Sequence, residues 1–253
     1  MKVLILIAHV DPICQSSAHR IAAATKEALL EDNHEVRVVD LIREGFDRCA
    51  SAYDFVSLKR PTKFNYLTEG GQDNLVQIIK TQQDHVRWCT HIIIVGPMWF
   101  FRYPACFAAY FERVWTYGFA YDCFRSGPPG LLEGKTVLCT MTTGGGAHEY
   151  SVEGPTTTLE TILYPVTVGH FSFCGCKVLR SQGFYKFRHE EDSEETLKKW
   201  KLAVKNIQNR PELPVKFYKG QKEGKAYINN GQNDGNVLSG LADFTFEDGI
   251  NAK

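Results

Sequence analysis

One stretch of the sequence decides the fold: Ile92-Ile93-Ile94-Val95-Gly96-Pro97-Met98-Trp99-Phe100-Phe101-Arg102-Tyr103-Pro104. Its first four residues form an apolar, β-branched run, which is typical of a strand covered on both faces. Pro104 then begins a helical pattern that extends to about Tyr117, since a proline costs nothing in the first turn of a helix. A buried strand followed by a loop and a helix is the repeating unit of an α/β fold.

The same unit repeats on both sides of this stretch. Apolar runs predict further strands, and apolar residues at steps of three and four predict further helices. The strands are expected at residues 3–7, 36–39, 136–141 and 171–179, and the helices at 17–30, 75–86, 158–166 and about 197–207. Strand–helix alternation predicts a parallel sheet with helices on both faces, and right-handed connections favour the five-stranded, doubly wound flavodoxin-like order.

The chain is expected to divide into one α/β domain and a tail. The domain should occupy residues 1–210, where the strand and helix patterns lie. From residue 211 to 253 glycine and asparagine become frequent and no core pattern is visible. We therefore expect an irregular C-terminal tail that is either docked on the domain or mobile.

Composition excludes several classes of protein. The 29 Lys and Arg residues balance the 29 Asp and Glu residues among 253, which argues against a dedicated nucleic-acid binder. The longest apolar stretch is about half the length that a membrane span needs, so no span is expected. Eight cysteines without paired spacing predict reduced thiols, a cytoplasmic location and no metal site.

The informative loops should be those that follow the strands, because ligands of open α/β sheets bind beyond the carboxyl ends of the strands. After the first strand, His9 is followed by Ser16 and Ser17 at the start of a helix. Hydroxyls and backbone N–H groups at a helix N-terminus suit a phosphate. A plain serine-capped helix explains the same residues equally well.

Two further loops carry aromatic residues and glycines. After the third strand come Pro97, Met98, Trp99, Phe100 and Phe101. They predict either a stiff wall for a flat ligand or an apolar plug of the core or an interface. After the fourth strand come Thr142, Thr143, Gly144, Gly145 and, a little later, Tyr150. This loop is either a ligand-facing set of N–H donors or a flexible turn. Convergence of all three loops at one edge of the sheet favours a ligand site.

The order and spacing of several motifs resemble the NAD(P)H:quinone oxidoreductases, also called the DT-diaphorase family, over roughly residues 1–210. The motifs are Pro97-Met98-Trp99-Phe100-Phe101, Pro104-Ala105, Phe111-Glu112-Arg113-Val114, Gly118-Phe119-Ala120-Tyr121, Gly130-Leu131-Leu132, and Thr142-Thr143-Gly144-Gly145 with Tyr150. The resemblance implies a homodimer with flavin at the subunit interface. It also implies that NAD(P)H and a quinone use one pocket in turn, by a substituted-enzyme (ping-pong) mechanism. FAD is favoured as the cofactor, and FMN is the alternative.

The resemblance assigns roles by position. The cofactor-binding residues would be His9, Ser16 and Ser17 at the phosphates, Pro97, Met98, Trp99, Phe100 and Phe101 along the ring, and Thr142, Thr143, Gly144, Gly145 and Tyr150 at its pyrimidine end. Tyr150 and the N–H groups of Gly144 and Gly145 would also be catalytic, because they would stabilise negative charge that develops on the reduced ring. Tyr121, Cys123 and Phe173 would line the substrate pocket.

The sequence departs from the family at two of these places. A family histidine that partners the loop tyrosine falls on Thr156, and a second pocket tyrosine falls on Cys123. Two other functions stay open: reduction of nitro or azo compounds on the same fold, and a non-catalytic role as a flavin electron carrier or a regulatory subunit of a transporter. The physiological acceptor and the preference for NADH or NADPH are also open.

Overall fold

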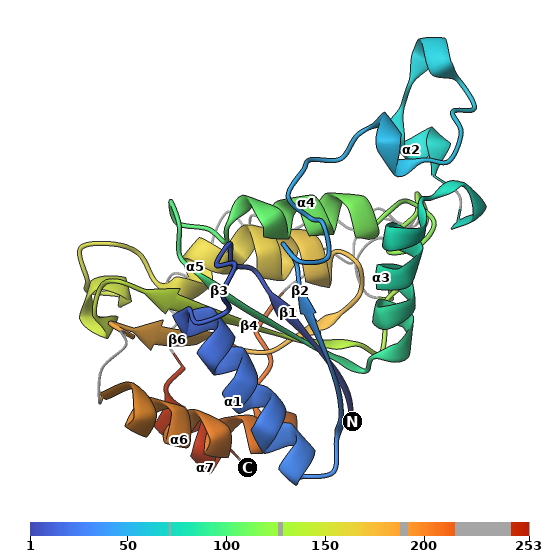
Figure 1. Cartoon of the computed structure of the whole chain (residues 1–253). Helices are drawn as coiled ribbons and strands as arrows, with labels where there is room; N and C mark the ends of the chain where they lie inside the picture. The colour runs from blue at the N-terminus through green and yellow to red at the C-terminus, as the bar shows by residue number, and fades with distance from the viewer. Residues whose placement is uncertain (71, 126–128, 188–191, 216–243, 253) are drawn as a thin grey trace.

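The computed structural model describes residues 1–70, 72–125, 129–187, 192–215 and 244–252 (Figure 1). A parallel sheet runs through the molecule in the order β2-β1-β3-β4-β5, and β6 also pairs with β4. The strands are β1 (Lys2–Ile7), β2 (Glu35–Asp40), β3 (His91–Pro97), β4 (Thr136–Thr143), β5 (Lys177–Val178) and β6 (Gln182–Tyr185). The predicted flavodoxin-like order is therefore confirmed.

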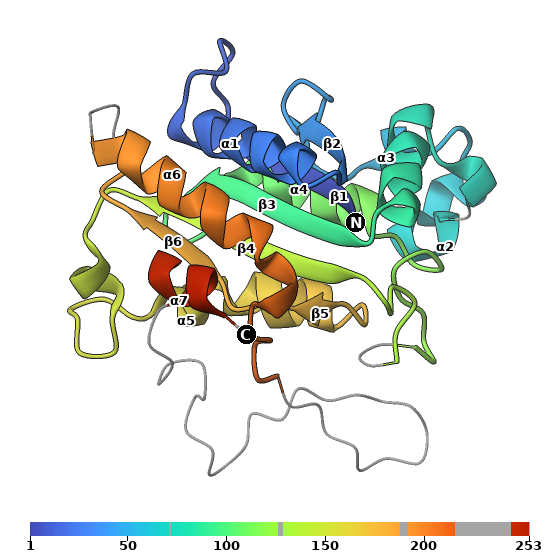
Figure 2. The ribbon, with the colours of Figure 1, turned by 90° about the horizontal axis from the view of Figure 1, so that it is seen from below.

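Helices cover both faces of the sheet, as Figures 1 and 2 show. One face carries α1 (Ser17–Glu31), α6 (Asp192–Lys205) and α7 (Phe246–Asn251); the other carries α3 (Gln77–Trp88), α4 (Ala105–Val114) and α5 (Leu159–Tyr164). Alternate residues of β1 point to opposite faces. Leu4 and Leu6 lie in the core beside α4, and Ile5 lies in the core beside α1 and α6. β1 is thus buried on both sides, whereas β2, at the edge of the sheet, is largely exposed.

The remaining elements are short. They are α2 (Tyr66–Glu69), a π-helix at Pro165–Ser172, and 3-10 turns at Ala52–Asp54, Pro61–Lys63, Gln72–Asn74, Ala147–Tyr150 and Ile207–Asn209. The helix expected from Pro104 to about Tyr117 begins one residue later and ends at Val114. None of the helices in the described ranges is long and apolar enough to cross a bilayer.

The strand predicted at residues 171–179 is wrong over its first half. Phe171 and Ser172 end the π-helix, and the strand itself is only Lys177–Val178. A short apolar run does not distinguish a buried helix from a buried strand, and here the burial of Phe171 is satisfied in a helix. Gly175, at φ +89°, turns the chain between the two. β6 completes this edge of the sheet beside β4.

The end of the tail is docked on the domain. The ring of Phe246, in α7, lies 5.3 Å from that of Phe184 and 6.4 Å from that of Trp200. Three backbone carbonyls of this segment accept hydrogen bonds from the side-chain amide of Asn206. Residues 244–252 are thus packed against the domain, and their helix α7 differs from the irregular structure expected for the tail. Most of the expected tail, residues 216–243, lies outside the described residues, and the division at residue 210 stays a prediction.

Candidate functional site

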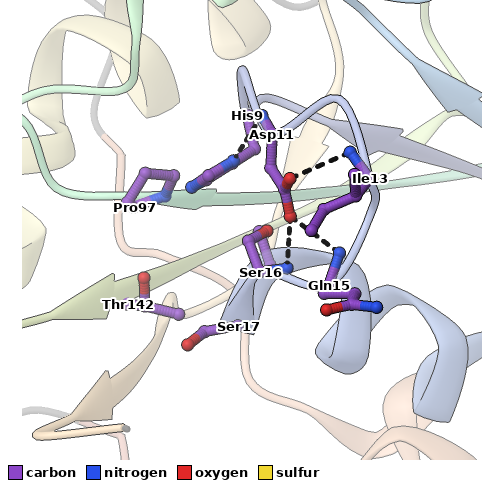
Figure 3. Close-up of a pocket in the computed structure, with 9 residues that line it drawn as sticks. His9, Asp11, Ile13, Gln15, Ser16, Ser17, Pro97 and Thr142 are labelled. Atoms are coloured by element: carbon purple, nitrogen blue, oxygen red, sulfur yellow. Dashed lines mark hydrogen bonds between the residues drawn. The ribbon is translucent and has the colours of Figure 1, made fainter. Parts of the chain in front are cut away.

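An open cavity of about 560 Å³ lies beyond the carboxyl ends of β1, β3 and β4 (Figure 3). Its lining residues are His9, Asp11, Ile13, Gln15, Ser16, Ser17, Ala18, Pro97 and Thr142. They come from all three loops that the sequence singles out. The position is the switch point of the sheet, where the strand order reverses between β1 and β3, and the volume is in the usual range for small-molecule pockets.

The loop after β1 is organised around the carboxylate of Asp11. One of its oxygens accepts a hydrogen bond from the N–H of Gln15 at 2.7 Å and another from that of Ser16 at 2.7 Å. The second oxygen accepts from the N–H of Ile13 at 3.0 Å (Figure 3). Burial alone would raise the pKa of Asp11, but these backbone hydrogen bonds outweigh it and lower the pKa. The carboxylate thus accepts hydrogen bonds from the same backbone N–H groups that a bound phosphate would need as donors.

The two predicted serines make different contacts. Ser16 is the N-cap of α1, and its hydroxyl accepts from the backbone N–H of His19. The hydroxyl of Ser17 donates to the carbonyl of Phe187 at 3.3 Å. Both residues line the cavity, so the plain capping role and the ligand-binding role are compatible in this structure.

His9 presents a hydrogen-bond donor to the cavity. Its Nδ1 accepts the backbone N–H of Asp11 at 3.0 Å, so the proton of the neutral ring lies on Nε2. That side of the ring points toward Pro97 across the cavity (Figure 3). Burial, and then the nearby His19, lower the pKa of His9, which keeps the imidazole neutral.

The aromatic residues after β3 form a strained hairpin turn. Trp99 and Arg102 exchange backbone hydrogen bonds of 2.8 and 3.1 Å, while Phe100 and Phe101 between them adopt φ of +50° and +58°. Such two-residue turns normally use glycine or asparagine. Phe100 is nevertheless 91% exposed and Phe101 59% exposed. Apolar rings held on a strained, exposed backbone indicate a binding surface.

This aromatic turn adjoins the other two loops. The ring of Trp99 lies 5.8 Å from that of His9. The N–H of Met98 donates to the carbonyl of Thr142 at 2.8 Å, which fixes the turn to the end of β4. The side chain of Met98 packs against the hydrophobic core, so it supports the wall of the site from behind.

The glycine loop after β4 leaves donors available. Among the described residues, no hydrogen bond engages the N–H groups of Gly144 and Gly145. A Cβ added at Gly144 would meet nothing within 4 Å, whereas one at Gly145 would lie 2.6 Å from the carboxylate of Glu149. That carboxylate accepts the N–H of Gly146 at 2.8 Å. The hydroxyl of Thr143 is turned inward and donates to the Gly145 carbonyl at 2.9 Å.

Tyr150 lies at the edge of this loop. Its ring stacks on that of Tyr185 with centroids 5.8 Å apart. Burial, and then the charge of Glu149, raise the pKa of Tyr150, so its hydroxyl stays protonated and can donate. Thr156 contributes a backbone N–H to the Glu149 carbonyl at 3.1 Å. The ring of His148 lies against Gly146, and no described contact makes it the missing proton relay.

The three predicted pocket residues gather in a separate aromatic cluster. The rings of Tyr121 and Phe173 lie 5.6 Å apart. Tyr117 joins the cluster 5.9 Å from Tyr121, and its hydroxyl donates to the sulfur of Cys123 at 3.4 Å. None of the three belongs to the described lining of the cavity. The structure therefore brings them to one another but not to the site.

A planar cofactor with an anionic end fits the two ends of this site unequally. The exposed aromatic turn offers a stacking surface, and the open N–H groups of Gly144 and Gly145 offer donors to a polar ring edge. At the other end of the site, the backbone donors that an anion would use are occupied by the carboxylate of Asp11. Sequence reasoning missed the roles of Asp11 and Glu149. An Asp-Pro pair ahead of a helix is a turn signal that could have found Asp11.

Comparison with known proteins places the chain in a wider context. The family model described as "Flavodoxin-like fold" matches residues 1–207. NAD(P)H dehydrogenase (quinone) 1 of Cavia porcellus is 33% identical over 223 residues, which are 85% of this chain and 80% of that protein. Human ribosyldihydronicotinamide dehydrogenase (quinone) is 30% identical over 84% of this chain and 94% of its own length. The NAD(P)H:quinone oxidoreductase of Methanothermobacter marburgensis superposes with a TM-score of 0.64 at 21% identity, over 82% of this chain and 97% of that one.

Proposed function

The chain belongs to the flavodoxin-like fold family and, within it, to the NAD(P)H:quinone oxidoreductases; on that premise we propose that it is a flavin-dependent two-electron reductase that oxidises NAD(P)H and reduces quinones. It is an oxidoreductase, as its relatives are. The observation that carries the proposal is the meeting of three loops at one cavity, with an exposed aromatic turn on the second loop and unengaged backbone donors on the third.

The residues that would hold the flavin follow from this geometry. Trp99, Phe100 and Phe101 offer the stacking surface, and Pro97 and Thr142 line the cavity. His9, Ser16 and Ser17 lie at the phosphate end. We propose FAD in preference to FMN, because the chain is long and has the animal-type organisation. A bound flavin would supply the redox chemistry, the transfer of two electrons from NAD(P)H to the acceptor, and the chain would supply its binding and orientation.

The chain's own contribution is orientation and electrostatics. The N–H groups of Gly144 and Gly145, with the Tyr150 hydroxyl, would donate to the ring edge where negative charge develops. Donors fixed before the reaction need no reorganisation, and one donor in such a site is worth about 2.7–4 kcal/mol. Because the pKa of Tyr150 is raised, its hydroxyl remains a donor throughout the physiological pH range.

A single cavity bordering the aromatic turn supports a substituted-enzyme order. NAD(P)+ would have to leave before the quinone could occupy the same space. Initial rates measured over a grid of both substrates should then give parallel lines in a double-reciprocal plot. Intersecting lines would mean that both substrates are bound together.

We propose that the protein acts as a homodimer with flavin at the interface. The cluster of Tyr121, Cys123 and Phe173 supports this proposal, because its side chains are partly exposed and do not line their own chain's cavity. A second copy could bring that cluster to the site. The proposed compartment is the cytoplasm, in keeping with eight cysteines that form no disulfide.

The test begins with the purified protein. Heating it should release a small molecule whose mass identifies FAD or FMN, and the flavin-loaded protein should oxidise NADPH steadily with menadione as acceptor. Oxidation with a nitro compound but not with menadione would replace quinone reduction by the nitro- and azo-reductase alternative. Oxidation with neither acceptor would favour the non-catalytic role. A protein that has no affinity for added FAD or FMN would overturn the proposal.

A further inference from the structure

A second group of chemically reactive side chains lies behind the loop that follows β1. Cys14 comes from that loop, His19 from the first turn of α1 and Asp40 from the end of β2. Nε2 of His19 lies 3.0 Å from Oδ2 of Asp40, and Sγ of Cys14 lies 3.6 Å from the same oxygen. All three ligand atoms lie within 4.8 Å of one another. They converge on one point from three different elements of the chain.

One of the two separations matches that between ligands of a zinc ion, and the other is shorter. Around a tetrahedral zinc ion, with Zn–S of about 2.3 Å and Zn–N or Zn–O of about 2.0–2.1 Å, S and O lie about 3.6 Å apart and N and O about 3.4 Å. The measured separations are 3.6 and 3.0 Å. The side chains of His19 and Asp40 are only 7% and 12% exposed, so the point is shielded from solvent. Small side-chain adjustments would be enough to admit an ion.

The imidazole and the carboxylate are already oriented by outer hydrogen bonds. Nδ1 of His19 lies 2.7 Å from the hydroxyl of Ser16, which leaves Nε2 directed at Asp40. Oδ1 of Asp40 accepts the N–H groups of Ile42 and Arg43 at 3.2 and 3.4 Å, which leaves Oδ2 directed at Cys14 and His19. Partners of this kind fix the ligating atoms in protein metal sites.

The backbone of Cys14 is strained in a way that serves this geometry. Its φ is +55°, in the left-handed region that non-glycine residues rarely adopt. A strained residue persists only where its surroundings impose the conformation. Here the N–H of Cys14 donates to the Asp11 carbonyl at 3.4 Å, and the thiol lies beside Asp40.

We propose that Cys14, His19 and Asp40 bind one zinc ion, through Sγ, Nε2 and Oδ2 respectively. A thiolate, an imidazole and a carboxylate together suit zinc, whereas magnesium and calcium prefer oxygen ligands alone. On binding, the thiol releases its proton to solvent, and the neutral imidazole carries its proton on Nδ1, beside the Ser16 hydroxyl, so that Nε2 is free to bind the ion. Arg43, whose Nε is 3.8 Å from Oδ2, is 61% exposed and can turn away into water.

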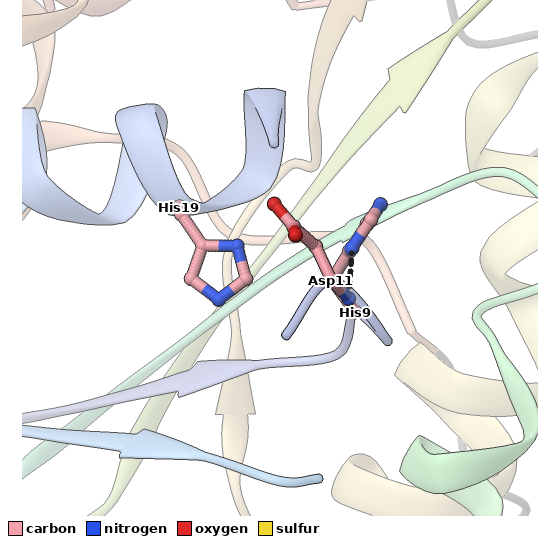
Figure 4. Close-up of side chains that lie close together, drawn as sticks. All are labelled: His9, Asp11 and His19. Atoms are coloured by element: carbon pink, nitrogen blue, oxygen red, sulfur yellow. Dashed lines mark hydrogen bonds between the residues drawn. The ribbon is translucent and has the colours of Figure 1, made fainter. Parts of the chain in front are cut away.

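A second group of ligand atoms adjoins the first. His9 and Asp11 lie together on one side of His19 (Figure 4), and His9, Asp11 and His19 have ligand atoms within 4.8 Å of one another. His19 belongs to both groups. Three protein ligands plus a water molecule is the arrangement of zinc sites that keep one position open. The site is thus adjacent to the proposed flavin cavity but distinct from its ring-binding wall.

The experiment measures zinc bound per chain by competition with a chromophoric chelator, under anaerobic conditions. The purified protein should bind one zinc ion. Cys14→Ser and His19→Gln should each weaken binding more than about a hundredfold, and Ser16→Ala about 10–100-fold. Cys49→Ser, which changes an exposed cysteine outside the cluster, is the matched control and should bind as the parent does. With Co²⁺ in place of zinc, a thiolate-to-cobalt absorption band should be present in the parent and absent in Cys14→Ser.

Failure of the parent to bind zinc, or undiminished binding in the folded Cys14→Ser and His19→Gln variants, would overturn the proposal. Circular dichroism of each variant shows that it is folded. The zinc measurement needs neither flavin nor substrate. A colourless protein that binds zinc would contradict the proposed reductase and leave the zinc site standing, and a yellow, active protein without zinc would do the reverse.

Discussion

The loop after β1 and the loop after β4 are both expected to offer backbone donors to a charged part of the ligand, yet they differ in what those donors already do. In the first loop, the Asp11 carboxylate accepts three N–H groups of the residues that lead into α1. In the second, the N–H groups of Gly144 and Gly145 are not engaged within the described residues, although the Glu149 carboxylate takes the next one. The number of donors in a loop does not tell how many are available.

The difference has a local physical cause. Asp11 lies four and five residues before the donors of Gln15 and Ser16, at the positive end of α1, where a carboxylate is stabilised by the helix dipole. Glu149 follows the glycines on a single 3-10 turn and reaches back only to Gly146. The backbone donors of the first loop are therefore hydrogen-bonded within the loop, and those of the second loop remain available to a ligand.

The largest change in flavin affinity is expected when the aromatic surface between the two loops is removed. Replacing Trp99 and Phe100 together by alanine should weaken FAD and FMN binding by about a hundredfold or more, since stacking on an aromatic side chain is worth about 1–3 kcal/mol each. Tyr53→Ala, which removes an exposed ring from a different region, should leave affinity unchanged. Flavin fluorescence titration measures both. Full retention of flavin in the double variant would mean that the loops do not flank one flat ligand, and the comparison would lose its basis.

Gly144→Ala tests the open loop. The added Cβ has nothing within 4 Å, so the thermal unfolding midpoint should not change, but the methyl group would occupy the space through which a ligand reaches the N–H groups. We expect flavin affinity to fall about tenfold or more. Gly169→Ala, where the added Cβ also meets nothing, is the matched control. Equal affinities in the two variants would show that the glycine loop does not contact the flavin.

Asp11→Asn tests the loop after β1, whose backbone donors are hydrogen-bonded to the Asp11 carboxylate. Removing the negative charge should tighten FMN binding by about tenfold, because the FMN phosphate would no longer approach a carboxylate in the same nest of N–H groups. Riboflavin has the same ring without the phosphate, so its affinity should not change. A parallel change in both ligands would mean that Asp11 acts through the fold of the loop and not through its charge.

The smallest expected effect is a change of a few fold with pH in the ratio of FMN affinity to riboflavin affinity. The lowered pKa of Asp11 keeps its carboxylate ionised throughout the range from pH 5 to 8, whereas a monoester phosphate gains its second negative charge near pH 6. Repulsion between the two should therefore grow as pH rises from 5 to 8. The ratio of FMN to riboflavin affinity should rise over this range in Asp11→Asn and should rise less, or fall, in the parent. Identical pH profiles would contradict an Asp11–phosphate contact.

Several features of the fold were predictable because they depend on local pattern. The apolar runs at residues 3–7 and 92–95 mark strands wherever they lie in a sheet, and Ser16 caps α1 as its position indicates. The meeting of the three loops also follows, since parallel strands place all their carboxyl ends at one edge. The strand predicted from residue 171 was wrong because the sequence indicates burial there, and burial is compatible with a helix as well as a strand.

The sequence alone determined the α/β layering, the strand order and the loops that border the cavity, because hydrophobic periodicity and connection handedness act over short stretches of chain. Only the tertiary structure decided that Asp11 occupies the nest at α1, that Tyr121 and Phe173 lie apart from the cavity, and that Cys14, His19 and Asp40 converge. These are contacts between atoms a few ångströms apart whose positions depend on the packing of whole elements. No spacing in the sequence encodes such distances.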